Sequence, residues 1–235
     1  MLIPAEHWGE DIAIDDSLVE YNLSAIKEKI AHYNNVKIIA VTKYFGLKAI
    51  ESGYKAGIRD FAESRAIESI DKINQLPQII KDNAIFHFIG HLQSNKVEKV
   101  VRYFDVIHSV DSLKIAKAIS KAACSINKRE KILLQLNNAG ETQKSGYSKE
   151  QLEIDFPEII SLDGIEVIGL MNMAPLAAQE VELHRLFSDV KEFRGFLEKK
   201  FQVTLPELSM GMSDDYQVAV QEGATMVRIG RKLFT

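Results

Sequence analysis

The stretch Val36-Lys-Ile-Ile-Ala-Val-Thr42 has the apolar, β-branched composition of a buried strand. Residues 47–56 follow with helical spacing and stop at Gly57, so the two segments form one strand–helix unit. Further strand-like runs occur at residues 58–61, 85–89, 105–110, 131–137, 165–171, 207–210 and 225–229, and all but the last precede a helical pattern. This alternation predicts the α/β class and a closed (β/α)8 TIM barrel, with an open doubly wound sheet as the alternative.

The chain offers no clear place to divide it into domains. It has five prolines and no run rich in serine and glycine. We therefore expect one domain over residues 1–235, with an N-terminal extension and helix in residues 1–35 and the barrel in residues 36–235. The extra helix is expected at about residues 17–33, capped by Asp15, Asp16 or Ser17, with Glu20 placed for a capping box on Ser17.

Composition argues against several classes of function. The formal net charge of −4 gives no electrostatic footprint for nucleic acid or an anionic membrane. No apolar run approaches the roughly 20 residues of a membrane span, and the acidic start does not resemble a signal peptide. We therefore expect a soluble, cytoplasmic protein. Cys124 is the only cysteine, which excludes an intramolecular disulfide, and its apolar helical surroundings predict a small core residue.

Polar residues gather where the expected strands end, which in a TIM barrel is the mouth that carries the chemistry. Lys43 ends the first strand. Partial burial there would disfavour the charged ammonium and free the amine to form an imine with a carbonyl compound. The same residue also fits a strand-end lysine that simply reaches water. Lys72 lies on a helical pattern and is expected at the solvated surface.

The segment Ser209-Met-Gly-Met-Ser-Asp-Asp215 has the composition of an anion-binding turn. Gly211 allows close approach of the backbone, the serine hydroxyls can donate, and a helix expected to start near Ser213 presents free N–H groups. Gly230 supplies a second point of close approach one strand later. Against this reading, Ser213 with Asp214 and Asp215 is also an ordinary helix cap, and two carboxylates are poor neighbours for a phosphate.

Two arginines and two histidines complete the candidate residues. Arg228 lies within the apolar last strand, where a charge is seldom placed without a partner, so it contacts a phosphate, a cofactor or a carboxylate, or forms a structural salt bridge. Arg231 is expected at the periphery with its backbone N–H toward the anion. His87 and His91 are four residues apart on a strand and turn rather than on a helix, so we predict no metal site there.

Seven segments, read in order, form a specific pattern: Ala40-Val-Thr-Lys43, Phe61-Ala-Glu63, His87-Phe-Ile-Gly-His-Leu-Gln-Ser-Asn-Lys96, Lys144-Ser-Gly146, Gly169-Leu-Met171, Leu208-Ser-Met-Gly-Met-Ser-Asp-Asp215 and Thr225-Met-Val-Arg-Ile-Gly230. Together they resemble the YggS/PROSC group, the pyridoxal phosphate homeostasis proteins related to the barrel domain of alanine racemase. The resemblance covers about residues 36–234.

The resemblance implies a role for each candidate residue toward pyridoxal 5′-phosphate (PLP). Lys43 would form an imine with the PLP aldehyde, and Arg228 would face the pyridine nitrogen. The phosphate would be held around Ser209, Met210, Gly211, Ser213, Gly230 and the Arg231 amide. The chain departs from the family pattern at the rim, where Ala62 and Ser64 replace the usual glycine and asparagine and Tyr44-Phe-Gly46 replaces Thr-Lys-Pro. Ser64 is the candidate rim contact in place of the asparagine.

The resemblance also implies a role in intracellular PLP (vitamin B6) homeostasis without robust catalytic activity. PLP-dependent apo-enzymes are the expected partners, and a monomer or weak dimer is the expected assembly. A PLP-dependent racemase is the alternative, but racemisation needs bases on both faces of the α-carbon. This chain ends five residues after Gly230, with no second domain and no tyrosine beyond Tyr216 to supply the other base. A third reading is a phosphosugar enzyme that uses Lys43 like an aldolase, with Glu63 as its acid/base partner.

Overall fold

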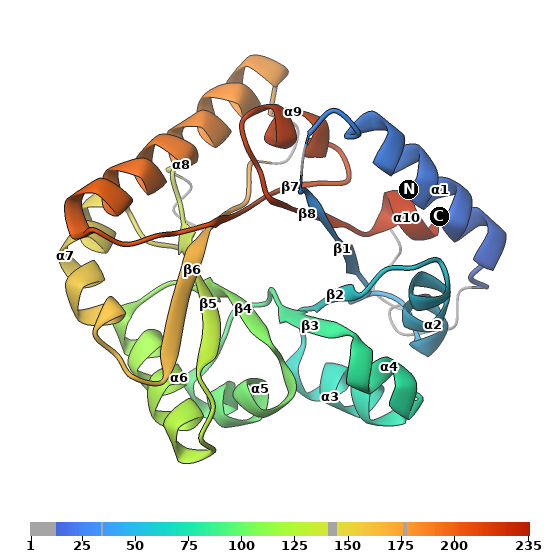
Figure 1. Ribbon diagram of the computed structural model, residues 1–235, viewed down its shortest axis with the longest axis horizontal. Helices are drawn as coiled ribbons and strands as arrows, with labels where there is room; N and C mark the ends of the chain where they lie inside the picture. The colour runs from blue at the N-terminus through green and yellow to red at the C-terminus, as the bar shows by residue number, and fades with distance from the viewer. Residues whose placement is uncertain (1–12, 34, 141–144, 176–177) are drawn as a thin grey trace.

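Eight parallel strands close into a barrel in the computed structural model, which describes residues 13–33, 35–140, 145–175 and 178–235. Figure 1 looks down this barrel, with the helices outside the ring of strands. The closed order from β1 to β8 confirms the TIM barrel and excludes the open sheet. The strands are β1 Lys37–Val41, β2 Asp60–Glu63, β3 Ile85–Phe88, β4 Val106–Val110, β5 Glu130–Leu136, β6 Ile165–Asn172, β7 Glu207–Met212 and β8 Met226–Ile229.

The helices follow the strands in the expected alternation. They are α1 Asp16–Lys29, α2 Leu47–Lys55, α3 Ala66–Gln75, α4 Gln78–Asn83, α5 Val97–Tyr103 after the 3-10 turn η2 Ser94–Lys96, α6 Leu113–Ser125, α7 Lys149–Ile160, α8 Glu180–Phe201, α9 Tyr216–Gln221 and α10 Arg231–Phe234. Helices α4 and α10 were not expected. Each is shorter than two full turns and so shows no helical periodicity in the sequence.

The start of β2 shows why one strand boundary differs from expectation. The strand was expected from Ile58, but it begins at Asp60. Gly57 ends α2 in a left-handed conformation, with φ of 97°, and the Ile58 N–H bonds back to the Gly53 carbonyl. This is the hydrogen-bond pattern of a Schellman turn, in which an apolar residue after the glycine packs on the helix. Ile58 is buried there, so its apolar character serves the helix end rather than the strand.

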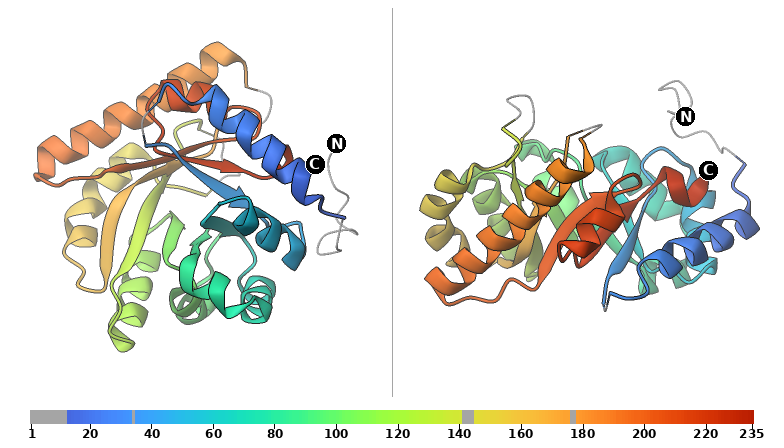
Figure 2. Two further views of the ribbon diagram at one scale, coloured as in Figure 1. Left: turned by 45° about the vertical axis from the view of Figure 1, so that its right-hand side comes forward. Right: turned by 90° about the horizontal axis from the view of Figure 1, so that it is seen from above.

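Helix α1 closes the outside of the barrel beside the C-terminal segment. Of the three candidate caps, Asp15 is the one used, because its carboxylate accepts from the N–H groups of Ser17 and Leu18. The Asn22 side chain donates to the Leu233 carbonyl at 3.2 Å, which ties α1 to α10. Figures 1 and 2 show this pairing of the blue and red helices on one side of the barrel.

Apolar side chains form two layers. The larger layer lies between the strands and the surrounding helices. The smaller fills the barrel interior and consists of Ile39, Val41, Ala62, Val106, Leu133, Ile168, Met171 and Met226. Cys124 is exposed, so the expectation of a core cysteine was wrong; it lies near the end of α6, where the helix surface meets solvent. Within the described residues, no helix combines the length and the apolar character that a membrane crossing requires.

Candidate functional site

Lys43 lies two residues beyond the end of β1, at the mouth formed by the carboxyl ends of the strands. Its side chain is half-buried, and its Nζ lies 4.9 Å from the centre of the Tyr44 ring. Strand β1 pairs with β8 in the register Ala40 to Ile229, so the segment after Ile229 runs beside the segment that carries Lys43. A Cβ added to Gly230 would lie 3.3 Å from the Val41 carbonyl oxygen, which confirms this close approach.

Lys72 stabilises the turn that carries Lys43 by hydrogen bonds to its backbone. Lys72 Nζ donates to the carbonyl oxygens of Thr42 at 3.0 Å and Phe45 at 2.7 Å, on either side of Lys43. It also forms an ion pair with Glu63 at 2.6 Å. The expectation that Lys72 is a solvated surface residue was therefore wrong; its side chain is only 14% exposed. Helical spacing placed it on α3 but did not reveal that this face of α3 meets the β1 turn.

Both carboxylate oxygens of Glu63 take part in this hydrogen-bond network. Its Oε1 also accepts from the Thr42 hydroxyl at 2.7 Å, and its Oε2 lies 3.3 Å from the Ser69 hydroxyl. A carboxyl group that accepts three hydrogen bonds and is only 2% exposed has a structural role. Glu63 therefore lacks the free, solvent-facing oxygen that the aldolase reading requires of an acid/base partner.

The ends of β7 and β8 form a polar cradle next to Lys43. The Gly230 N–H donates to the Ser213 hydroxyl oxygen at 3.3 Å, which joins the two strand ends. Gly230 is the cap of α10, whose first N–H groups have no partner within the helix. Lys232 Nζ reaches the Ser213 carbonyl at 3.2 Å and adds positive charge. This donor-rich geometry suits an anion.

The two carboxylates beside the cradle are already occupied. Asp214 is exposed and pairs with the Arg231 guanidinium at 2.9 Å. Asp215 is buried, and its Oδ1 accepts from the Met212 N–H at 2.5 Å within the turn. It makes no side-chain cap bond to α9, so the ordinary helix-cap reading does not describe this segment. Because both carboxylates already have partners, they repel an anion in the cradle less than their positions in the sequence suggest.

Gly211 has a structural reason beyond close approach to an anion. Its φ is 91°, a conformation that favours glycine, and an added Cβ would lie 2.6 Å from the Ala219 Cβ. Strand β7 therefore needs this glycine to turn against α9. Met210 beside it is fully buried among the residues between the barrel and its helices.

Arg228 points into the barrel, where it is 3% exposed. Its Nη1 donates to the Ser209 carbonyl and hydroxyl oxygens, both at 2.7 Å, and its Nη2 donates to the Asn172 carbonyl at 2.8 Å. Burial lowers the pKa of the guanidinium to about 10, which still leaves it charged at neutral pH. The partners are oxygens of two neighbouring strands, so the structural salt bridge considered for Arg228 is not what holds it. Ser209 is fully buried, and its hydroxyl serves Arg228 and His108 inside the barrel.

Ser64 lies at the end of β2, half-buried on the rim. Gly90 packs so closely on its backbone that an added Cβ would come within 2.0 Å of the Ser64 carbonyl oxygen. His87 and His91, where we predicted no metal site, lie in different surroundings. His87 is buried and His91 is exposed. The structure thus brings Lys43, Ser213, Gly230 and Arg231 together at the β1, β7 and β8 ends. Arg228 and Ser209 lie below them, and Ser64 follows β2, which pairs with β1 in the register Val41 to Ala62 and so runs beside the Lys43 segment on its other side.

Sequence reasoning missed two residues of this region: Lys72 and His108. A usable signal for His108 was the period of two along each strand, since its neighbour Ile107 packs in the outer layer. His87, His108 and Arg228 all share the inward side by the same count. No comparable signal marks Lys72, because its partners come from a different strand–helix unit.

Comparison with known proteins identifies the family of the chain. The family described as "Alanine racemase, N-terminal domain" matches residues 14–235. A pyridoxal phosphate homeostasis protein of Synechocystis is 42% identical over 200 residues, which are 85% of this chain and 91% of that protein. The homologue of the same name from Aquifex aeolicus is 35% identical over 201 residues, 86% of this chain and 87% of its own.

Solved structures give the same result. PipY of Synechococcus elongatus, 35% identical, superposes with a TM-score of 0.87 without PLP and 0.84 with PLP bound; each alignment covers 92% of this chain and 100% of PipY. An alanine racemase from Clostridium difficile shares the fold with a TM-score of 0.78 at 16% identity, over 94% of this chain and 57% of its own. The chain therefore belongs to the family of pyridoxal phosphate homeostasis proteins, whose barrel is that of the alanine racemase N-terminal domain.

Proposed function

We propose that this protein binds PLP at the carboxyl-end mouth of the barrel and acts in PLP homeostasis as a carrier or regulator without robust turnover. The observation that carries the proposal is the adjacency of Lys43 to the cradle of Ser213 and Gly230 across the β1–β8 pair. An amine and an anion site side by side suit a ligand that has both an aldehyde and a phosphate. PLP has both groups.

The residues present fit PLP chemically. The Ser213 hydroxyl, which accepts from the Gly230 N–H, and the Arg231 N–H are donors for a phosphate, and Lys232 adds a cation. Asn172, whose carbonyl holds Arg228, has a buried Oδ1 with no hydrogen-bond partner among the described residues. A buried acceptor of this kind is normally satisfied, so it favours a polar ligand nearby.

Bound PLP supplies an aldehyde for covalent attachment to an amine and an electron-withdrawing ring. In this proposal Lys43 holds the aldehyde end, the cradle holds the phosphate, and Arg228 donates to the ring nitrogen. A guanidinium has donors only and cannot give up its proton at neutral pH, so Arg228 keeps the ring nitrogen unprotonated. An unprotonated ring withdraws electrons weakly, which suits holding the cofactor better than carbanion chemistry.

The relatives support a homeostatic role over racemisation. The named homologues are homeostasis proteins, and PipY has a structure with PLP bound. Racemisation needs a second base on the opposite face of the substrate, and the buried Glu63 is engaged by Lys72 and Thr42. We also propose PLP-dependent apo-enzymes as recipients of the cofactor, and a monomer or weak dimer as the working form.

An absorption titration with PLP tests the proposal. The parent protein should develop the long-wavelength band of a covalently attached cofactor, and Lys43→Ala should lack it. Lys48→Ala is a matched control, because Lys48 lies on the adjacent α2 and pairs with Asp16 at the surface. A parent without the band, or a Lys43→Ala variant that retains it, would refute covalent binding at Lys43.

Polarimetry with free L-amino acids separates the carrier from the racemase. The loaded parent should leave the optical rotation essentially unchanged over hours. Sustained loss of rotation that disappears in Lys43→Ala would assign the protein to the racemase alternative. Transfer is tested by mixing the loaded protein with an apo-enzyme while a scavenger removes free PLP, and recovery of apo-enzyme activity is expected.

A further inference from the structure

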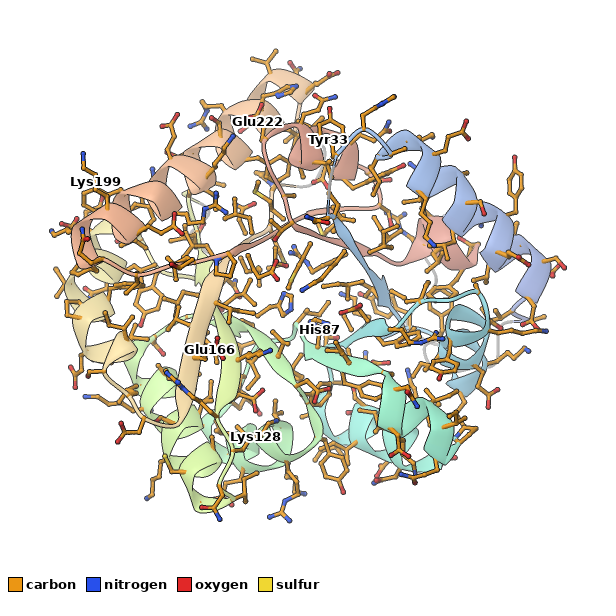
Figure 3. The ribbon with its side chains drawn as sticks, viewed as in Figure 1. Tyr33, His87, Lys128, Glu166, Lys199 and Glu222 are labelled. Atoms are coloured by element: carbon orange, nitrogen blue, oxygen red, sulfur yellow. The ribbon has the colours of Figure 1, made fainter. Side chains whose placement is uncertain are left out.

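A line of polar side chains crosses the otherwise apolar barrel interior. Arg228 Nη1 lies 2.7 Å from the Ser209 hydroxyl oxygen, which lies 2.8 Å from His108 Nδ1. His108 Nε2 lies 2.8 Å from His87 Nδ1, and His87 Nε2 lies 3.0 Å from Asp60 Oδ1. These five residues come from β8, β7, β4, β3 and β2. Figure 3 shows His87 within the ring of strands.

The direction of every bond follows from the chemistry of the two ends. A guanidinium can only donate, so the Ser209 oxygen accepts from Arg228; an ionised Asp60 and two neutral rings then leave the hydroxyl proton to point at His108 Nδ1. That nitrogen is then the acceptor of a neutral ring, so His108 carries its proton on Nε2 and donates to His87. His87 in turn accepts on Nδ1 and donates from Nε2 to Asp60, whose carboxylate can only accept when ionised.

The charges at the ends favour this direction. Arg228 is a buried cation at one end, and Asp60 supplies an anion at the other, so every bond dipole points the same way between them. Desolvation lowers the pKa of the fully buried His108 far below its ordinary value, with the nearby His87 and Arg228 acting in the same sense. His108 is therefore neutral at physiological pH, as the one-way chain requires.

The far end of the chain reaches the opposite mouth of the barrel. A cavity of about 510 Å³ opens there, and Asp60 and His87 are part of its lining. Lys37 and Glu207 face it as an ion pair at 2.8 Å. The other charged groups of its lining are Asp105, Lys128, Arg129, Lys131 and Glu166.

We propose that Asp60, His87, His108 and Ser209 are positioning residues that form one directed hydrogen-bond chain through the barrel. The chain orients Arg228 and links its guanidinium electrostatically to a carboxylate at the mouth opposite the candidate PLP site. The part that concerns the cofactor rests on the proposed function. The part that concerns the chain stands on these distances alone.

Histidine NMR on the protein without cofactor tests the chain itself. Long-range ¹H–¹⁵N correlation at pH 7.5 should show both His87 and His108 as neutral rings with the proton on Nε2. In Ser209→Ala the His108 Nδ1 resonance should move, because that nitrogen loses the hydroxyl that donates to it. A proton on Nδ1 of either ring, or a doubly protonated His87, would reverse a link and overturn the proposal.

A matched pair of charge removals tests the link to the cofactor. Asp60→Asn and Glu166→Gln each remove one negative charge from the same mouth, but only Asp60 ends the chain. Loss of a negative charge disfavours protonated forms, so Asp60→Asn should move the pH midpoint of the bound-cofactor absorption band downward, by about 0.3 unit. Glu166→Gln should move it clearly less. Equal shifts, or none for Asp60→Asn, would show that the chain does not reach the cofactor.

The two experiments fail separately. If PLP produces no absorption band in the parent, the proposed function fails while the histidine tautomers still decide the chain. If the band forms but both rings carry the wrong tautomer, the chain fails and PLP binding stands. Thermal unfolding of each variant at pH 7.5 verifies that the measurements are made on folded protein.

Discussion

Glu63 and Glu130 are both buried glutamates paired with a lysine, but they differ in the hydrogen bonds that their carboxylate oxygens accept. Glu63, at the carboxyl end of β2, accepts hydrogen bonds from Lys72 and from two hydroxyls. Glu130, at the start of β5, lies 2.6 Å from Lys128 Nζ, but among the described residues neither of its oxygens has a partner in hydrogen-bond geometry. The same residue types at the same distance therefore form a satisfied site at one mouth and a poorly satisfied one at the other.

The difference shows that a nearby lysine does not by itself satisfy the hydrogen-bonding capacity of a buried carboxylate. Burial raises the pKa of Glu130 to about 7, against the opposing effect of Lys128. Desolvation of an ion is repaid only when hydrogen bonds complete the pairing. The satisfied pair supports the turn that carries Lys43, whereas the other lies away from the candidate site.

Removing the Glu63 carboxylate is the severest test of this contrast. Glu63→Ala leaves Lys72 largely buried without its counter-ion and should lower the free energy of unfolding by about 4 kcal/mol in urea denaturation. Glu63→Gln keeps an acceptor for the Thr42 hydroxyl and should cost about half as much. A loss below about 1 kcal/mol for Glu63→Ala would mean that the network is not a satisfied unit.

Lys72→Met removes the ammonium group, the other partner of the buried ion pair. We expect a loss of about 3 kcal/mol, somewhat less than for Glu63→Ala, because two hydroxyls still donate to Glu63. The freed Thr42 and Phe45 carbonyls should loosen the Lys43 turn and weaken PLP binding about tenfold by absorption titration. The control is Lys48→Met, which removes a surface lysine and should leave PLP binding unchanged. Unaltered affinity in folded Lys72→Met protein would remove Lys72 from the site.

Glu130→Gln sharpens the contrast through its pH dependence. The folded pKa of Glu130 is raised from 4.5 to about 7, so the folded protein holds a proton that the unfolded chain releases between these values. Stability from this group is therefore present at low pH and is lost as pH rises toward 7. Glu130→Gln should be more stable than the parent by about 2 kcal/mol at pH 8, with most of the gain gone at pH 5.

Paired measurement at each pH cancels the titration of other groups, including His108. Glu130→Gln that is less stable than the parent at pH 8 would show that Lys128 satisfies Glu130 after all. The two glutamates would then be alike, and the contrast between the mouths would not hold.

An exposed ion pair should show the smallest effect on the free energy of unfolding. Lys117 and Glu158 lie 2.5 Å apart with side chains about half exposed. Lys117→Ala should change the free energy of unfolding by less than about 0.5 kcal/mol, because water screens and competes for exposed charges. A loss comparable to that of Lys72→Met would mean that burial does not explain the difference between these pairs.

Much of the fold was predictable because it depends on local pattern. The run VKIIAVT predicted β1, and the helical spacing of residues 47–56 predicted α2. The errors have local causes too, since Ile58 completes a Schellman turn and α4 and α10 are too short for a helical period. The candidate site was predictable to the extent that its members are strand ends: Lys43, Ser213 and Gly230 each follow an apolar run.

The rest depends on contacts between distant segments. Lys72 was assigned to solvent because its own helix reads as amphipathic, and only the packing of α3 under the β1 turn gives it three acceptors. Ser209 was assigned to the anion site because of its neighbours in sequence. The alternation of β7 instead turns its hydroxyl into the barrel, toward Arg228 and His108.

The order and type of the elements, and the mouth at which Lys43 and Gly230 would meet, were determined by the amino-acid sequence alone. Hydrophobic periodicity and parallel connections act within each strand–helix unit, so local residues carry that information. Only the tertiary structure decided which buried charges are satisfied and that Asp60 connects to Arg228 through two histidines and Ser209. Barrel closure brings residues from five strands within hydrogen-bond distance, and desolvation in that interior makes each such contact energetically decisive.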